Sequence, residues 1–402
     1  MMKTGKNKRL LASILAASML LAMSPFALAE GTEGQEQPVE GGGTEQTCAA
    51  KIGETEYSTV ADALAAANIY DANSDVTIVM LHDVTENIEI NRSLTLDLDG
   101  HTLSGDGEKT VVSISGKDKD MDVTVKNGTV TGGHATNGGG FDIQRGNIKI
   151  ENCIIEKNTA TSGGGVNIGG SANVKITGSE IRDNTVTGAS GGAIYLASGW
   201  AYDGYYNCVC EIVDTKLNGN SASVGGAVGL GASLFHDGIN NAYGGKGVTA
   251  TFIMDGKSTI DGNTAKYGGA VHLTGNGSRF LMKNGTITNN KATSTDGGAI
   301  WATNFGGVTI EKGTISGNTA KTYGGAIYMK ANIGEKNDSA KLAIATGVRD
   351  VLNLGDVLIT DNHAKQGGGI YIDSYPSAYG IKADLKQASI YNNHASVRAD
   401  DI

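Results

Sequence analysis

The side chains best suited to bind a metal ion fall in two places. Asp118, Asp120 and Asp122 alternate in the segment GKDKDMD, and carboxylate oxygens are ligands that Ca²⁺ prefers. His363 and His394 each follow an asparagine by one residue in neighbouring repeats, which brings two imidazoles together. Three carboxylates are few for calcium, and no third ligand accompanies the histidines. We therefore favour an exposed turn and two surface histidines, and we expect no metal site and no cofactor.

A second set of side chains suits ligand binding. Phe, Trp and Tyr make up only 5 % of the chain, yet aromatic rings or histidines recur at one position of a repeat. Strand alternation turns this position outward. Rings held ~5 Å apart on a rigid sheet would form a platform on which sugar or peptide groups stack. The alternative is an aromatic ladder that only stabilises neighbouring coils or lies under long loops. The candidate binding residues are Tyr195, His272, Trp301, Tyr328 and Tyr371.

Two alternating motifs define the repeat that positions these residues. The first is Gly-Gly-(Ala/Gly)-apolar-x-apolar, and the candidate residue occupies its x. It begins at Gly138, Gly163, Gly191, Gly225, Gly268, Gly297, Gly324 and Gly367. The second is apolar-x-x-Asn-x-Ala, in which we interpret the Asn as a buried ladder that satisfies backbone groups at a coil corner. Its asparagines are Asn158, Asn184, Asn220, Asn263, Asn290, Asn318, Asn362 and Asn393.

The columns before the Asn predict the core. The residue three positions before it is apolar in every copy, from Ile155 to Ile390. Positions ten and eight before it are also apolar and alternate with polar residues, which is the period of a strand. Asp255 is the one exception at the second of these positions. Three short strands per ~25 residues predict a single-stranded right-handed parallel β-helix, an all-β solenoid whose equivalent residues stack from coil to coil.

The two ends of the repeat region differ. The segment Tyr57–Asn68 is rich in Ala and Leu and predicts a short helix that caps the N-terminal end of the core. Residues 48–137 should hold this helix and the first irregular coils, and residues 138–402 the regular repeats. After Asn393 a ninth Gly-Gly pair is expected near residue 398, but the sequence ends at Ile402, so we expect a coil that stops part-way.

Residues 1–29 resemble a secretory signal peptide, with Lys3 to Arg9 basic, an apolar run, and Ala27-Leu28-Ala29 before Glu30. Residues 30–47 are an acidic Gly/Glu linker that we expect to be disordered. Removing residues 1–29 takes away four positive charges and changes the net charge from -10 to -14. A chain this acidic lacks the positive charge that nucleic-acid binders carry. No segment is long and apolar enough for a membrane span.

Three of the four cysteines align with small or apolar positions of the repeat. Cys153 falls in a column of small residues, and Cys210 falls in an apolar column with Cys208 two residues earlier. Cys153 and Cys210 lie two coils apart, roughly 10 Å, which exceeds the ~7 Å reach of a disulfide. We therefore predict free, buried thiols.

The paired motifs, Gly-Gly-Ala-Ile and x-x-Asn, resemble those of chlamydial-type polymorphic outer membrane proteins over residues 138–402, with Ile or Leu where that family usually has Phe. The opening, including YSTVADALAAAN and SLTLDLDGHTL, is similar to pectin-lyase-like β-helices of bacterial surface proteins. The first resemblance implies a secreted or cell-surface adhesin. The wider fold also includes pectate lyases and polygalacturonases, so the fold alone does not decide the function.

Catalytic signatures of those enzymes are missing. The Asn-Thr-Asp, Gly-His-Gly and Arg-Ile-Lys motifs of polygalacturonases are absent from the sequence, and the six arginines after residue 29 share no position in the repeat. We therefore predict no catalytic residue and rank binding or adhesion first, with a polysaccharide or a host-surface glycoprotein as the partner. A polysaccharide lyase or glycoside hydrolase is second and a passive structural stalk is third. The oligomeric state does not follow from the sequence.

Overall fold

A computed structural model gives the fold. It describes residues 47–70, 75–116, 120–188, 190–197, 200–201, 204–205, 207–231, 249–275, 277–303, 306–330, 351–373, 382–385 and 387–402. The expected signal peptide, nearly all of the expected linker, and Asp118 lie outside these residues. The insertions that lengthen some repeats, at 198–207, 234–246 and 331–348, lie partly or wholly outside the described residues as well.

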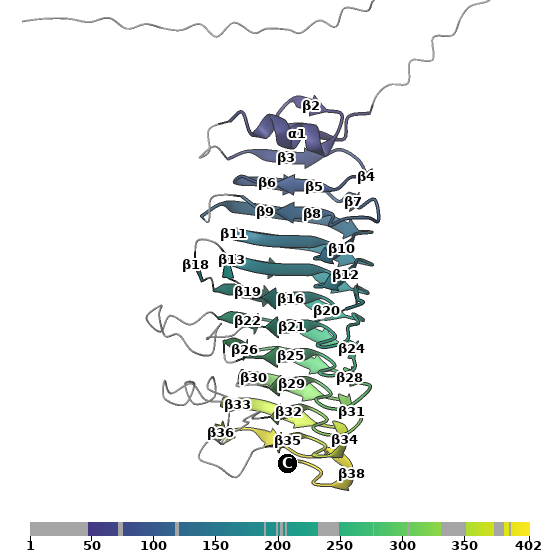
Figure 1. Cartoon of the computed structure of the whole chain (residues 1–402), viewed down its shortest axis with the longest axis vertical. Coiled ribbons are helices and arrows are strands. Elements are labelled where there is room, and N and C mark those ends of the chain that lie inside the picture. The colour runs from purple at the N-terminus through teal and green to yellow at the C-terminus, as the bar shows by residue number, and fades with distance from the viewer. Residues whose placement is uncertain are drawn as a thin grey trace, which may run out of the picture. The chain divides into compact units, whose positions relative to one another are not determined.

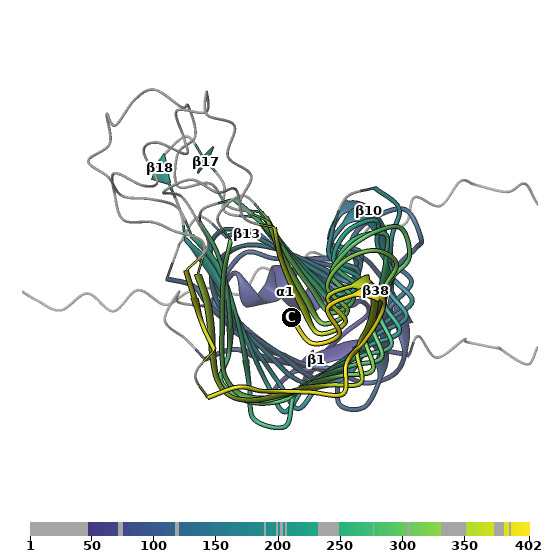
Figure 2. The same ribbon diagram turned by 90° about the horizontal axis from the view of Figure 1, so that it is seen from below.

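The protein is an all-β chain with a single eight-residue helix in the part described, and nearly all of its strands pair in parallel. Each strand pairs with the strand at the same place one repeat later, so the repeats form successive layers (Figure 1). Viewed along the stack, equivalent strands overlie one another (Figure 2). The expectation of an all-β chain with parallel strands is thus confirmed. Within the described residues, no helix has the length and apolar character needed to cross a membrane.

Four sets of strands make up the layers. The strands before each Asn motif, or in the corresponding place of the first coils, are β3 (Thr77–Met80), β6 (Leu94–Asp97), β9 (Asp122–Thr131), β19 (Cys208–Val213), β22 (Ala250–Asp255), β26 (Ser278–Met282), β30 (Gly307–Ser316), β33 (Val351–Thr360) and β36 (Lys382–Asp384). Those at the motif are β4 (Val84–Thr85), β7 (Thr102–Ser104), β14 (Glu180–Arg182), β20 (Lys216–Asn218), β23 (Thr259–Asp261), β27 (Thr286–Thr288) and β37 (Ser389–Ile390).

The other two sets follow the motifs. The strands after each Asn, or in the corresponding place of the coil before Asn158, are β10 (His134–Asn137), β12 (Thr159–Ser162), β15 (Thr185–Val186), β24 (Thr264–Ala265), β28 (Lys291–Ala292), β31 (Thr319–Ala320), β34 (His363–Gln366) and β38 (His394–Arg398). Those after Gly-Gly, or in its place in the first coils, are β5 (Ile88–Ile90), β8 (Val112–Ile114), β11 (Phe141–Glu156), β13 (Val166–Thr177), β16 (Ile194–Ala197), β21 (Val228–Gly231), β25 (Val271–Thr274), β29 (Ile300–Thr303), β32 (Ile327–Lys330) and β35 (Ile370–Asp373). Two antiparallel strands, β17 (Trp200–Ala201) and β18 (Gly204–Tyr205), form a separate hairpin.

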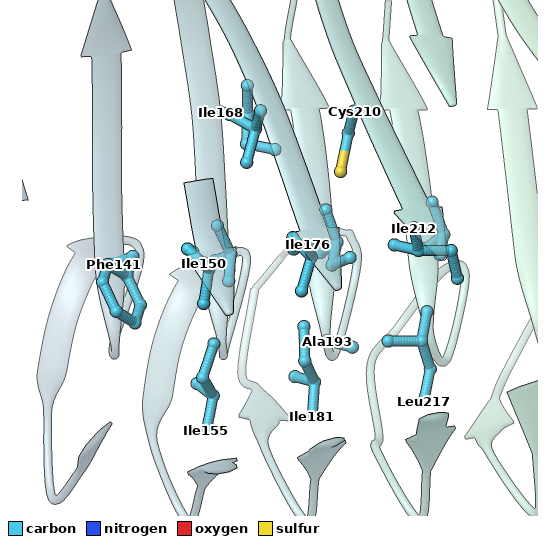
Figure 3. Packing of buried hydrophobic residues seen from close by; sticks show 14 of the residues in the cluster. Phe141, Ile150, Ile155, Ile168, Ile176, Ile181, Ala193, Cys210, Ile212 and Leu217 are labelled. Carbon is cyan, nitrogen blue, oxygen red and sulfur yellow. The ribbon is translucent and has the colours of Figure 1, made fainter. Parts of the chain in front are cut away.

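The column three residues before each Asn is one inward stack, as predicted. Ile155 pairs with Ile181, Ile181 with Leu217, and the pairing continues to Ile359 and Ile390. The seven members up to Ile359 are fully buried, and Ile390 in the last coil is partly buried. Figure 3 shows the first three members in a row, with a second row formed by Ile150, Ile176 and Ile212 above them. Stacking identical positions in this way gives the protein a continuous apolar core.

The apparent exception at Asp255 is a misalignment in our reading of the sequence. In β22 the core residues are Phe252 and Met254, which pair with Phe280 and Met282, while Asp255 points away from the core. Five residues lie between Met254 and the next core residue, Ile260, whereas four lie between the equivalent residues of the following coil, Met282 and Ile287. One additional residue in this turn shifts the count from the Asn, so the apolar column itself is unbroken.

The asparagines form the expected buried ladder, and all eight are 0–2 % exposed. In each coil the Asn donates its backbone N–H and its side-chain Nδ2 to the Oδ1 of the Asn in the next coil, at 2.9–3.1 Å. At the last coil, Asn393 instead donates both bonds to the carboxylate of Asp401. The ladder thus satisfies a buried backbone donor and a side-chain amide in each layer.

The helix α1 (Val60–Ala67) forms within the predicted segment Tyr57–Asn68. Thr59 is its N-cap and accepts a 2.9 Å hydrogen bond from the N–H of Asp62. The Glu86 carboxylate accepts from the first two backbone N–H groups, and Arg92 donates to the Ala67 carbonyl at the other end. Opposite charges at the two ends complement the helix dipole.

Two antiparallel strands beside the helix were not predicted. β1 (Ala50–Ile52) pairs with β2 (Thr55–Tyr57) and with β3. The buried residues of α1, which include Val60 and Leu64, belong to the same apolar cluster as the coils. In Figure 2 α1 lies within the outline of the stacked strands.

Cys153, Cys208 and Cys210 are free and buried, as predicted, and Cys48 is half-buried. Burial raises the pKa of Cys153 and of Cys208 to about 12, and it raises the pKa of Cys210 further. Thiolate is the reactive form, so these three side chains should be inert at neutral pH.

We expect a thiol reagent such as Ellman's reagent to titrate one cysteine per native chain, Cys48, and the remaining three only after unfolding in guanidinium. A Cys48→Ser variant is the control, and in its folded state it should not react with the thiol reagent. A second thiol that reacts rapidly in the native protein would contradict the burial described here.

Candidate functional site

The candidate binding residues stack in one column, as predicted. Tyr195, on β16, pairs with Gly229, and Gly229 pairs with His272, on β25. The column continues through Trp301 on β29 and Tyr328 on β32 to Tyr371 on β35. None of the five residues belongs to the apolar core cluster, because each lies between two inward-pointing residues of its strand.

The side chains of this column are less exposed to solvent than their position on the outer side of the strands implied. His272 is 8 % exposed and Tyr328 is 3 % exposed, so both are buried. Tyr195, Trp301 and Tyr371 are partly exposed. Strand alternation predicts which side chains leave the core, but it does not predict what covers them. At His272 and Tyr328 the column is therefore covered, as in the aromatic ladder that we weighed as the alternative to an open platform.

A second column, which the sequence interpretation missed, provides part of that cover. It consists of the residue before each Gly-Gly pair, including Tyr267, Asp296 and Tyr323. Successive members are one coil apart, because Gly268 N–H donates to the Asp296 carbonyl and Gly297 N–H to the Tyr323 carbonyl. The signal was present in the sequence as Tyr-Gly-Gly at two of the eight repeats. We aligned only the residues after Gly-Gly and so overlooked it.

The rings of the two columns meet in two groups of three. In the first ring cluster, the Trp301 indole stacks on Tyr267 at 4.9 Å and on His272 at 4.6 Å between ring centroids. The second ring cluster consists of Tyr323, Tyr328 and Tyr371, with centroid separations of 4.5–6.1 Å. These separations lie in the range of favourable aromatic contacts. Both clusters join neighbouring coils, which agrees with the stabilising role we weighed for the column.

Asp296 lies between the two ring clusters. Its coil places a carboxylate where the preceding and following coils place the rings of Tyr267 and Tyr323. Burial raises the pKa of Asp296 to about 6, although a hydrogen bond from the Tyr323 backbone and the charge of Lys330 act in the opposite direction. The carboxyl is therefore mainly ionised at neutral pH. On β35, Asp373 accepts a hydrogen bond from the Tyr328 hydroxyl at 3.3 Å and pairs with Lys330 at 3.4 Å.

Buried polar atoms without a partner concentrate around Asp296. Seven such side-chain atoms occur in the described part of the chain, and four of them belong to this region. They are His272 Nδ1, Thr295 Oγ1, Asp296 Oδ1 and Trp301 Nε1. His272 is uncharged, because burial lowers its pKa to about 3. An unsatisfied buried polar group is unfavourable by about 1–3 kcal/mol, so this cluster has hydrogen-bonding capacity that the protein itself does not use.

Three segments of this region match a known repeat family. Residues 284–303, 312–330 and 356–373 match the Chlamydia polymorphic membrane protein repeat. The chain contains polymorphic membrane protein repeats. Each matched segment includes one ladder asparagine (Asn290, Asn318 or Asn362) and ends on the strand of the outward column. No curated protein and no solved structure matches the chain.

Tyr195 lies apart from the ring clusters and outside the three segments that match the polymorphic membrane protein repeat. The next coil has Gly229 at this position, and a side chain there would meet the Ser190 hydroxyl, 2.1 Å from its Cβ. The ring column is thus interrupted for one coil. Among our five candidates, the structure brings His272, Trp301, Tyr328 and Tyr371 into the two clusters and leaves Tyr195 two coils away.

The possible metal ligands do not form a larger group. The rings of His363 and His394 lie 4.9 Å apart, as their spacing suggested, and both side chains are exposed. In the parts of the chain that the structure describes, no three His, Cys, Asp or Glu side chains are placed to hold a metal ion.

Proposed function

We propose that this protein is exported to the cell surface and binds glycans or surface glycoproteins through the strip formed by its two ring clusters. The observation that supports this most directly is the pair of three-ring clusters fixed on a parallel sheet. A rigid array of rings loses little conformational freedom when a ligand binds. The polymorphic membrane protein repeats support a surface location and an adhesin-like role, and residues 1–29 support export.

We further infer that the stacked coils form a right-handed parallel β-helix of the pectin-lyase-like type, with α1 as the cap of its N-terminal end. The coil-by-coil parallel pairing and the continuous apolar core support the β-helix. The burial of one face of α1 against the first strands supports the cap, because the terminal repeats of a solenoid need a polar outer surface. A stack of this kind holds the ring clusters at fixed spacing.

Replacing Trp301 by Ala should weaken glycan binding by about tenfold or more, because buried aromatic anchors dominate binding energies. Binding of the purified chain and its variant to a glycan array, followed by titration calorimetry on the strongest ligand, would measure the effect. Trp301 also packs on Tyr267 and His272. We therefore expect the substitution to lower the free energy of unfolding by about 1–3 kcal/mol.

The matched control is Tyr391→Ala, which removes an exposed ring (54 % exposed) outside the two clusters. This variant should bind as the parent does. Equal binding by the parent and a folded Trp301→Ala variant would contradict the proposal and would favour a purely structural role for the rings.

Polysaccharide cleavage is the second candidate function, and one observation favours it. Asp296 has a raised pKa, which suits a general acid, and the charge of Asp373 contributes to that rise. Glycosidases commonly use two nearby carboxyl groups of unequal pKa. Incubation with polygalacturonate and neutral polysaccharides, with and without calcium, would decide between the candidates. New reducing ends or unsaturated products would establish an enzyme, and their absence together with glycan binding would support the binding function.

A further inference from the structure

Asp296 differs in chemistry from everything that surrounds it in the ring strip. Tyr267 and Tyr323 occupy its position in the neighbouring coils, and each covers a ring of the outward column. At Asp296 this cover is a half-buried carboxylate, and its Oδ1 is buried without a hydrogen-bond partner. A binding strip that served only for apolar contact would not need a charge here, because half-burying a carboxylate with one oxygen unpartnered is unfavourable.

The polar atoms near Asp296 match the groups that a sugar presents. A sugar ring has an apolar face that stacks on aromatic rings and hydroxyl groups that donate and accept hydrogen bonds. The strip contains a half-buried carboxylate at Asp296, which accepts one hydrogen bond from the Tyr323 backbone. Its Oδ1 and the indole Nε1 of Trp301 are buried atoms without a hydrogen-bond partner. His272 is nearly fully buried and adds an unpartnered Nδ1 beneath the indole. These groups lie on two adjacent coils, because His272 pairs with Trp301.

The charge of the site argues against acidic glycans. The cation whose charge acts on Asp296 is Lys330, and Lys330 already pairs with Asp373 at 3.4 Å. Two carboxylates therefore face one ammonium group, and the whole chain is acidic, with a net charge of -10. A uronate placed on the strip would bring like charges together, which is unfavourable.

We propose that Asp296 is the charged hydrogen-bond acceptor of a binding site for uncharged glycans, in which sugar rings stack on the two ring clusters and a sugar hydroxyl donates to the Asp296 carboxylate. This proposal rests on the proposed glycan-binding function and adds the class of ligand and the residue that selects it.

The test compares oligosaccharides of equal length and different charge. Neutral hexamers of glucose and mannose and a hexamer of galacturonate would be titrated calorimetrically into the full chain at neutral pH. We expect the best neutral hexamer to bind at least about tenfold more tightly than the galacturonate hexamer. Asp296→Asn should lower the affinity for the neutral hexamer by about tenfold, because a hydrogen bond to a charged group is stronger than one to an amide. The same variant should reduce the ratio between the affinities for the neutral and the galacturonate hexamers.

Two further variants control the charge and the fold. Asp122→Asn removes an exposed carboxylate remote in sequence from the strip and should change neither affinity. Asp296→Glu keeps the charge and should keep the discrimination against galacturonate, even if the affinity falls. Thermal unfolding would confirm that each variant is folded.

The outcomes separate this proposal from the function on which it rests. Binding that depends on Trp301 but is unchanged in Asp296→Asn, or a preference for galacturonate, would overturn the role of Asp296 and leave glycan binding in place. Failure of every neutral hexamer to bind would also overturn the proposal. Binding that is insensitive to both residues would remove the strip itself as the site.

Discussion

Replacing Asn290 by Ala should destabilise the protein by about 3–5 kcal/mol. Asn290 Oδ1 accepts both the backbone N–H and the Nδ2 of Asn263 at 2.9 Å, and its Nδ2 donates to the carbonyls of Ile260 and Thr288 and to Asn318. All of these contacts are lost in alanine. The N–H of Asn263 is then left in the interior without this acceptor, and each unsatisfied buried group is unfavourable by about 1–3 kcal/mol.

Urea unfolding followed by circular dichroism would measure the loss, and hydrogen exchange would show where it acts. We expect faster exchange in the coils of Asn263 and Asn318, because stability in stacked repeats depends on contacts between neighbours. The matched control is Asn284→Ala in the same coil, where the side chain is exposed. If both variants unfold at the same urea concentration, the ladder contributes little to stability.

The regular parts of the fold followed from the sequence because their spacing is strict. The column from Ile155 to Ile359 lies at a constant distance from the Asn in every coil, so simple alignment on the Asn finds it. Asp255 shows the limit of this method. One additional residue between Met254 and Ile260 moves the count by one, and strand alternation then assigns the wrong side chain to the core.

The candidate site was only partly predictable for a different reason. The register of the outward column depends on local pairing, so His272 and Trp301 could be placed next to one another. The cover supplied by Tyr267 and Tyr323 depends on how the chain turns at Gly-Gly and lays one column against the other. Likewise, the role of Asp296 becomes visible only when its neighbours in the adjacent coils are known to be rings. Alternation gives the side of a strand, and burial requires the tertiary arrangement.

The turn that brings the two columns together depends on glycine at its second position, and Gly298→Ala should be severely destabilising. A Cβ at Gly298 would lie 2.1 Å from the carbonyl oxygen of Gly325 and 2.7 Å from the backbone of Thr319. Both contacts are with the main chain of the next coil, which cannot move without stretching the hydrogen bond from Gly298 N–H to the Gly324 carbonyl. Overpacking a core typically costs about 1–3 kcal/mol, and because the clash here is with backbone we expect at least the upper value.

Gly262→Ala isolates this steric effect from the effect of backbone conformation. Gly262 has a positive φ of +63°, but no atom lies within 4 Å of a Cβ placed there. Its substitution should therefore lower the free energy of unfolding only by the energy needed to hold alanine in the left-handed conformation, about 1–2 kcal/mol. The lower entropy of the unfolded chain partly offsets this loss. Gly298 has no positive φ to lose, so its larger loss of stability would come from the contact between coils. Urea midpoints of the two variants measured side by side give the comparison. Equal losses would mean that the coils can separate locally to accept a methyl group, and the ring clusters would then be held less rigidly than the binding proposal requires.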